Sequence, residues 1–401
     1  MITEIDIEKL EDEGIEMNRS DIVIGAIAGD MIGSPYEFSS IKTTDFPLFS
    51  EKSCFTDDTV MTIAVLDALL EYEEQTGTDL LGFWRLKGID WGKLNRLFVS
   101  TMKSFGRAYP NAGYGGRFSE WLFSDSTEPY NSYGNGSAMR VSPVGAFFND
   151  ADLIDKVAEA SAAVTHNHPE GIKGAKAVAD AIHLASSMDK KGIKNTLKIK
   201  HGYNFYRTLD KIRPGYRFDV TCQGSVPEAI ICFFEGNSFE EVVRLAVSLG
   251  GDSDTQAAIA GSIAAARYGV PEEIKAEAIK RLPGDLLAVY NRFDEETNPS
   301  KQELRAREWE KERRSKIPPG LHATILGFLE EWKAQTTPDV WEELLGSDPI
   351  LTHFGLGMWI RNTYLYKNEK IQEGFREAGY FFVDDMSEVM LEIWIDELSK
   401  Q

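Results

Sequence analysis

The hydrophobic positions along this chain recur mainly with the spacing of α-helices. Residues 21–33 (DIVIGAIAGDMIG) are apolar on nearly every side, which is typical of a buried helix, and a second buried helix is expected over 57–74. Few segments alternate with the period of a strand, and no strand–helix–strand rhythm recurs. The pattern therefore predicts an all-α main body, with further helices at 91–105, 151–187, 226–234, 238–249 and 254–267.

Three glycines recur at a regular interval in the first of these helices. Gly25, Gly29 and Gly33 are four residues apart and therefore share one helix face. A glycine inside a helix costs about 1 kcal/mol relative to alanine. Three of them on one face predict that another segment packs very close to it.

Several segments between the helices lack this periodicity. Residues 34–54 contain two prolines and many small polar side chains, and are predicted as a long ordered loop. Glycine-rich stretches at 111–118 and 131–143 are predicted as backbone-lined loops, and 188–221 as an irregular excursion. Loops this long inside a compact domain are often functional.

A change in composition divides the chain near residue 300. Residues 298–320 (NPSKQELRAREWEKERRSKIPPG) are strongly charged and end in a Pro-Pro-Gly stop. Amphipathic segments rich in Trp, Phe and Glu follow. We predict a main domain over 1–300, and a charged linker helix with a small helical domain over 301–401.

The strongly negative net charge of the chain limits the kinds of molecule that it is expected to bind. The 401 residues include 64 acidic and 43 basic side chains, which gives a formal net charge of −21. Such a surface repels phosphate backbones and anionic lipids, which argues against a general nucleic-acid-binding face and against membrane binding. The three cysteines form no CxxC pair, the N-terminus lacks the layout of a signal peptide, and no apolar run reaches the roughly 18 residues of a membrane span. We therefore expect a cytoplasmic protein.

Two short acidic segments stand directly before buried helices, at 56–58 (TDD) and 252–255 (DSDT). Asp and Thr are favoured helix N-caps, so capping is one interpretation. However, paired carboxylates at the edge of the interior repel one another and lose hydration. A hard cation such as Mg²⁺ or Mn²⁺ removes that cost. The residues alone leave capping and a metal site both open.

Seven segments, taken together, resemble the ADP-ribosylglycohydrolase family and occur in the family's order. They are GAIAGDMIGSPYEF, FTDDTVMT, NAGYGGRFSEW, YGNGSAMRVSPVG, THNHPEG, CQGSVPEAI and LAVSLGGDSDTQAAIAGSIAAARYG, and they cover most of residues 21–285, the expected core. The pairing of TDDT with GGDSDT is the most specific part. The resemblance implies a compact all-α bundle with a centre of two Mg²⁺ ions, Mn²⁺ being the alternative, in a protein that removes ADP-ribose from modified targets.

The resemblance also implies roles for individual residues. Glu37 corresponds to a family carboxylate that has a catalytic or gating role. Without the resemblance, Glu37 would be interpreted as a solvated residue of a loop. The implied metal ligands are Thr56, Asp57, Asp58, Asp252, Asp254 and Thr255. The implied contacts to the ribose and diphosphate of the ligand are Tyr114, Gly115, Gly116, Ser132, Tyr133, Asn135, Gly136 and His166.

Four other residues are interpreted more cautiously. Asp30 is expected to pack against neighbouring backbone rather than take part in chemistry. Arg140 is expected to pair with a buried carboxylate, and a phosphate of the ligand is the alternative partner. Tyr216 and Phe218 are candidates for stacking on a ligand ring, although a loop aromatic more often anchors its own loop.

The resemblance implies hydrolysis at C1″ of the ADP-ribose unit, and we expect an oxocarbenium-like transition state with Glu37 as general acid or base. The expected partner is an ADP-ribosylated protein or another ADP-ribosylated molecule. Three alternatives remain: a catalytically silent ADP-ribose-binding relative, an antagonist of an ADP-ribosylating toxin, and a two-metal phosphoesterase that cleaves the diphosphate. The C-terminal domain is expected to contact a partner protein or a second subunit, or to cover the surface of the core.

Overall fold

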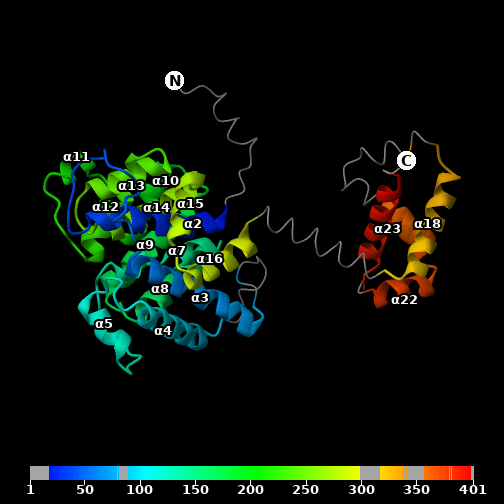
Figure 1. Ribbon diagram of the computed structural model, residues 1–401, viewed down its shortest axis with the longest axis horizontal. Helices are drawn as coiled ribbons and strands as arrows, with labels where there is room; N and C mark the ends of the chain where they lie inside the picture. Colours follow the sequence, from blue (N-terminus) through cyan, green and yellow to red (C-terminus); the bar gives the residue numbers. More distant parts are fainter. Residues whose placement is uncertain are drawn as a thin grey trace, which may run out of the picture. The chain divides into compact units, whose positions relative to one another are not determined.

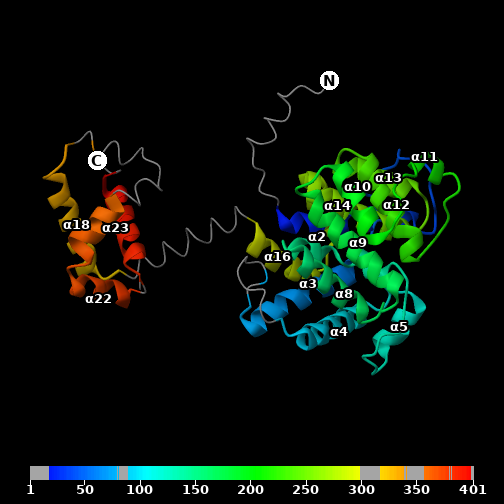
Figure 2. The same cartoon turned by 180° about the vertical axis from the view of Figure 1, so that it is seen from behind.

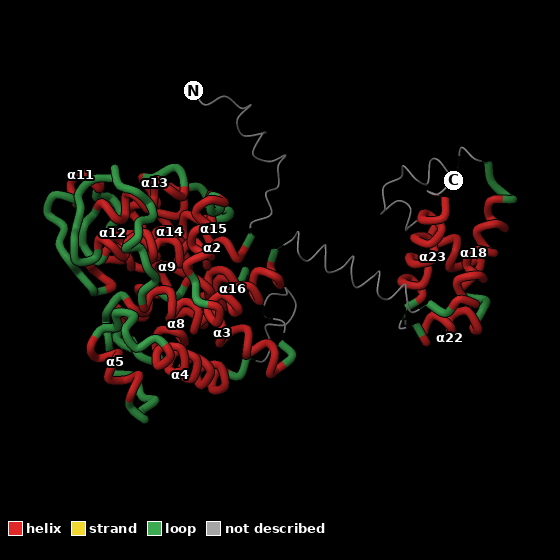
Figure 3. The backbone as a smooth tube through the Cα atoms, in the orientation of Figure 1, coloured by secondary structure: helices red, strands yellow, loops and turns green. Residues whose placement is uncertain are grey.

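A computed structural model of the protein describes residues 18–78, 80, 89–298, 317–337, 340, 356–378, 380 and 382–398. The chain divides into two compact units, Met1–Lys301 and Gln302–Gln401. Within the described ranges the regular elements are helices, and an isolated bridge pairs Gly134 with Thr221 (Figure 3). The predicted all-α class is confirmed.

The first unit contains the elements that build the candidate site (Figure 1). Their bounds are α2 (Arg19–Gly33), η1 (Ser34–Tyr36), α3 (Asp57–Thr76), α4 (Trp91–Ala108), α5 (Gly116–Phe123), α6 (Gly136–Met139), α7 (Ser142–Phe147), α8 (Ala151–Ala163), α9 (Pro169–Ala185), α10 (Lys190–His201), α11 (Leu209–Ile212), α12 (Cys222–Glu235), α13 (Phe239–Ser248), α14 (Ser253–Tyr268), α15 (Glu272–Arg281) and α16 (Gly284–Thr297).

The centre of this unit is the pair α2 and α14, which lie side by side in both views (Figures 1 and 2). Almost every residue of both helices is buried. The glycine face of α2 makes this packing possible, because a Cβ on Gly29 would lie 2.1 Å from the carbonyl oxygen of Ala257. A Cβ on Gly33 would lie 2.6 Å from the Cα of Asp254. The glycine repeat thus brings the acidic start of α14 against the end of α2.

The acidic start of α3 is fixed by Asp30, which is 0% exposed. Its carboxylate accepts hydrogen bonds from the backbone N–H and the hydroxyl of Thr56, at 2.9 and 2.8 Å, and from the same two groups of Thr59. Thr56 also caps α3 by accepting from the Asp58 N–H. Asp30 therefore has the structural role that its sequence context predicted, and it holds the helix start that carries Asp57 and Asp58.

The prediction of an irregular excursion over 188–221 is wrong for its first part, because α10 occupies Lys190–His201. Its buried positions are Ile193, Leu197 and His201, spaced four apart. Lysines and other polar residues between them concealed the apolar stripe. The glycine-rich stretch 131–143 likewise contains the short helix α6 and the start of α7.

Helix α5 starts at Gly116 beside the predicted ligand loop and is held at its other end by two cations of α4. Lys103 donates to the carbonyl oxygens of Trp121 and Ser124, and Arg107 donates to those of Leu122 and Ser124. These carbonyls have no partner inside the helix, so the two side chains cap it. The cap fixes the end of α5 opposite the glycine loop.

The second unit has its own apolar core, in which the rings of Trp332 and Trp394 stack with centroids 5.6 Å apart. Its described helices are α18 (Pro319–Lys333), α21 (Met358–Ile360), η3 (Arg361–Leu365), α22 (Glu369–Glu377) and α23 (Val383–Leu398). The predicted linker helix lies outside the described residues. No helix in the described ranges combines the length and the apolar character that a membrane span requires.

Candidate metal centre and ligand pocket

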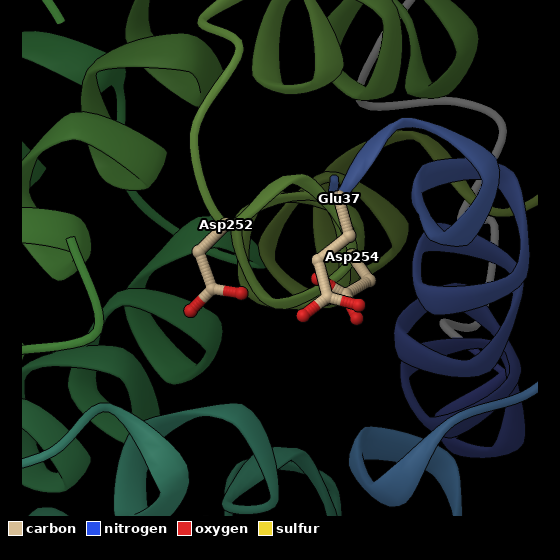
Figure 4. Close-up of side chains that lie close together, drawn as sticks. All are labelled: Glu37, Asp252 and Asp254. Atoms are coloured by element: carbon tan, nitrogen blue, oxygen red, sulfur yellow. The ribbon is translucent and has the colours of Figure 1, made fainter. Parts of the chain in front are cut away.

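Three carboxylates converge where α2, its following turn and α14 meet. Glu37 follows η1, Asp252 is the residue before α14, and Asp254 lies in the first turn of that helix. One oxygen of each lies within 4.8 Å of the others (Figure 4). Figure 4 shows the three side chains extending to the same side of the α14 start.

The acidic start of α3 joins this group. Asp57 and Asp58 line the same cavity as Glu37, Asp252 and Asp254. The hydroxyl of Thr255 donates to Asp58 Oδ2 at 3.1 Å and so connects the two acidic segments directly. The structure therefore brings together segments that are far apart in the sequence.

Burial makes this concentration of negative charge costly. Burial is the main cause that raises the pKa of Asp57, Asp58, Asp252 and Asp254, and repulsion from neighbouring carboxylates raises these pKa values further. The pKa of Glu37 rises to about 7, first by burial and then by repulsion from Asp252 and Asp30. Burial and mutual repulsion therefore favour proton binding by this group, and a counter-charge would remove that tendency.

The donor set fits hard divalent cations. Asp58 Oδ1 and Asp254 Oδ1 are buried, and no described residue forms a hydrogen bond with either oxygen. An unpaired buried carboxylate oxygen is expensive, whereas Mg²⁺ and Mn²⁺ prefer such oxygens as ligands. The residues present thus suit a metal centre and are not explained by helix capping alone.

The two threonines predicted as metal ligands are already bonded to carboxylates. The Thr56 hydroxyl donates to Asp30, and the Thr255 hydroxyl donates to Asp58. A hydroxyl oxygen that donates its hydrogen keeps lone pairs for a cation, so these bonds orient both oxygens. Their role as ligands stays a prediction.

A cavity of about 460 Å³ opens beside the carboxylates. Most of the predicted ligand-binding residues line it, namely Gly115, Gly116, Ser132, Asn135, Gly136 and His166. Tyr114 and Tyr133 are not part of its lining. The Tyr114 ring packs against Phe118, and Tyr133 is 47% exposed with its ring against His168.

Asn135 connects the glycine loop to the carboxylates. Its Nδ2 donates to Asp252 Oδ2 at 2.6 Å, and both residues are buried. Its backbone N–H donates to the carbonyl oxygen of Val220 at 2.8 Å. The asparagine therefore orients a predicted metal ligand while it lines the cavity.

The aromatic and basic residues differ from the predictions in part. Among the residues that the structure describes, no carboxylate forms an ion pair with Arg140. Its guanidinium donates to the Ser161 carbonyl and the Thr165 hydroxyl, so the predicted pairing with a carboxylate is wrong. The Tyr216 hydroxyl donates to the Gly224 carbonyl and accepts from Gln256, which anchors its loop.

Three phenylalanines among the described residues line the cavity, namely Phe38, Phe118 and Phe218, and Phe118 is the buried one. Phe218 stacks on Phe38, with ring centroids 5.9 Å apart. Both rings are exposed, Phe38 to 83%. Sequence reasoning missed Phe38, although its position directly after Glu37 was a usable signal.

Comparison with known proteins agrees with this geometry. Residues 20–304 match the family described as ADP-ribosylglycohydrolase, and residues 318–398 match a family described as "Domain of unknown function (DUF6794)". An uncharacterized protein of Archaeoglobus fulgidus is 28% identical over 62% of this chain and 88% of its own length. ADP-ribosylhydrolase ARH3 of Gallus gallus is 28% identical over 61% and 83%. ADP-ribosylarginine hydrolase Tri1 of Pseudomonas putida is 26% identical over 62% and 70%.

The first family match spans well over half of the chain. It contains both acidic segments, the glycine-rich loops and the turn that carries Glu37. The chain therefore belongs to the ADP-ribosylglycohydrolase family.

Proposed function

We propose that this protein is a hydrolase that releases ADP-ribose from a modified acceptor by cleaving the glycosidic bond at C1″. The observation that carries the proposal is the set of buried carboxylates with unpaired oxygens, Asp58 Oδ1 and Asp254 Oδ1, beside a glycine-lined cavity. The names of the relatives ARH3 and Tri1, an ADP-ribosylhydrolase and an ADP-ribosylarginine hydrolase, support the substrate class.

The four aspartates of the two acidic segments, with Thr56 and Thr255, would hold two Mg²⁺ ions. When bound, such ions would polarise the ribose hydroxyls and lower the pKa of a water. Asp58 and Asp254 have free oxygens for this, and Asn135 holds Asp252 in place. Mn²⁺ has the same ligand preferences and is the alternative.

Glu37 is the proposed proton carrier. Burial and repulsion from Asp252 and Asp30 raise its pKa to about 7, and bound cations would lower that pKa and favour the ionised form that accepts a proton. We infer that Glu37 accepts a proton from the attacking water while the bond between C1″ and the acceptor breaks and its electron pair leaves with the acceptor. The acceptor then takes up a proton, and free ADP-ribose is the other product.

The glycine-rich loops are proposed to hold the diphosphate. Gly115 and Gly116 have open space where a Cβ would stand, so an anion can approach their backbone closely. Gly116 also begins α5, whose N-terminus favours negative charge. Backbone recognition of this kind suits a protein whose net charge is −21.

The test is a release assay on substrates ADP-ribosylated at arginine, at serine and at a DNA base, with Mg²⁺, with Mn²⁺ and with a chelator. We expect one linkage to release ADP-ribose and the chelator to stop the reaction. Asp254→Asn should abolish release, whereas Asp152→Asn, which changes an exposed aspartate in α8, should not.

The product of this assay separates the proposed hydrolysis from the alternatives. Formation of AMP instead of ADP-ribose identifies a phosphoesterase. Binding of ADP-ribose without release from any substrate identifies a silent or antagonist protein, and either result overturns the proposal.

That the C-terminal unit contacts a partner protein stays a prediction. It would be tested by using the full chain as bait and comparing the proteins that co-purify with it to those that co-purify with a variant altered at the exposed residues Met358 and Tyr366.

A further inference from the structure

A chain of buried hydrogen bonds ends at the cavity wall that carries His166. Arg140 and Thr165 are 0% exposed and His166 is 4% exposed. The Arg140 guanidinium donates to Thr165 Oγ1 at 2.8 Å and to the Ser161 carbonyl oxygen at 3.0 Å. Thr165 Oγ1 and His166 Nδ1 lie 2.8 Å apart. Three consecutive groups thus form one network.

The chemistry of the groups sets the direction of these bonds. A guanidinium can only donate, so Thr165 Oγ1 accepts from Arg140. In the part of the chain that the structure describes, the Thr165 hydroxyl has no acceptor other than His166 Nδ1. A buried donor without an acceptor costs about 1–3 kcal/mol. Thr165 therefore donates to Nδ1, which leaves the hydrogen of a neutral imidazole on Nε2.

The imidazole is held neutral by its surroundings. Burial lowers the pKa of His166 well below its usual range, and the positive charges of Arg140 and Arg117 lower it further. The pKa of Arg140 falls only to about 10, so its guanidinium stays charged at neutral pH. Nε2 lies against the glycine loop, because a Cβ on Gly136 would stand 3.2 Å from it and a Cβ on Gly134 would stand 3.6 Å from it.

We propose that Arg140 and Thr165 are positioning residues that fix His166 as an uncharged Nε2–H donor to an oxygen of bound ADP-ribose. The identity of this ligand rests on the proposed function. In this role His166 donates a hydrogen bond to an oxygen of ADP-ribose and orients it. His166 exchanges no proton with the substrate, so its role differs from that of Glu37. The sequence points to Arg140 and to the segment of Thr165 but not to the contact between them, which only the fold supplies.

The tautomer can be read directly by NMR of the full-length protein labelled with ¹⁵N-histidine. The chain has six histidines, and the His166 signals are assigned with His166→Gln. We expect a protonated Nε2 and an unprotonated Nδ1 near neutral pH. Thr165→Val removes the hydrogen bond to Nδ1 and offers no acceptor in its place, so the ¹⁵N signal of the unprotonated Nδ1 should shift. Thr165→Ser keeps the hydroxyl and should restore the spectrum of the unmodified protein.

The same variants have an expected effect on binding. Loss of one neutral hydrogen bond should weaken calorimetric binding of ADP-ribose by about 3- to 10-fold in Thr165→Val. KM should rise by a similar factor with little change in kcat, because the bond is made in the ground state and the transition state alike. The matched control is Thr101→Val: this threonine is also buried, but its hydroxyl donates only to carbonyls of its own helix. It should change neither the imidazole signals nor KM.

The inference is wrong if His166 of the unmodified protein carries its hydrogen on Nδ1, or if Thr165→Val alters neither the imidazole signals nor ADP-ribose affinity. Failure of the proposed function looks different. In that case no modified substrate releases ADP-ribose, whereas the NMR signals and the binding of ADP-ribose itself still report on the hydrogen-bond chain.

Discussion

Replacing Gly29 by alanine tests whether the backbone contact between α2 and α14 determines the fold. The new Cβ would stand 2.1 Å from the carbonyl oxygen and 2.5 Å from the carbonyl carbon of Ala257. An ordinary contact requires at least 3.4 Å. The neighbouring atoms are backbone of a buried helix, so no side chain can rotate away, and the two helices would have to separate by about 1 Å.

The expected cost follows from two opposing effects. Overpacking of a core costs about 1–3 kcal/mol, and the rigid backbone here favours the upper end. Alanine gains about 1 kcal/mol over glycine inside a helix. We therefore expect Gly29→Ala to lower the free energy of unfolding by about 2 kcal/mol. Gly284→Ala is the matched control, because no atom lies within 4 Å of its new Cβ, and it should raise stability by about 0.4–1 kcal/mol.

Urea unfolding of the full chain, followed by far-UV circular dichroism, measures both variants. Hydrogen exchange of peptides from α2 and α14 separates unfolding of the first unit from unfolding of the second. If Gly29→Ala were as stable as the unmodified protein, or gained stability as Gly284→Ala should, the close approach of the two helices would not be the reason for the glycines.

Three other perturbations have expected outcomes. Asp30→Asn keeps the shape of the side chain but cannot accept all four of its hydrogen bonds. The free energy of unfolding in urea should fall by about 3 kcal/mol, and calorimetry should show a weaker affinity for Mg²⁺. An unchanged unfolding curve would contradict the anchoring role of Asp30. Glu37→Gln should lower kcat by about 10²- to 10⁴-fold with little change in KM, whereas Glu51→Gln, an exposed residue of the same loop, should leave both unchanged. The raised pKa values of Asp30 (about 6) and Glu37 (about 7) favour the protonated folded state, so their stabilising effect is present below pH 4 and lost as the pH rises to 7. The increase in Tm on adding Mg²⁺ to the chelated protein should therefore be larger at pH 8 than at pH 5, and equal increases would refute this coupling.

The sequence by itself determined the helical class, the buried character of α2 and α3 and the Thr56 cap. These features depend on local periodicity and on which side chains can cap a helix. Both can be recognised from residues that are close together in the sequence. The glycine repeat of α2 predicted a close neighbour but could not identify it. The acidic segments predicted carboxylates at two helix starts, and only the resemblance to a family suggested that the two meet.

Only the tertiary structure determined how close those carboxylates lie to one another and which hydrogen bonds they form. The bond from Thr255 to Asp58 and the bond from Asn135 to Asp252 join residues that are distant in the sequence, so no local pattern records them. Lysines between the buried positions of α10 concealed that helix, since a narrow apolar stripe is visible only when its packing partner is known. The sequence favoured a carboxylate as the partner of Arg140, whereas the folded chain supplies a hydroxyl and a carbonyl oxygen instead. Long-range contacts set the charge, the burial and the hydrogen-bond direction of each side chain. They therefore decide which residues of the protein take part in the chemistry.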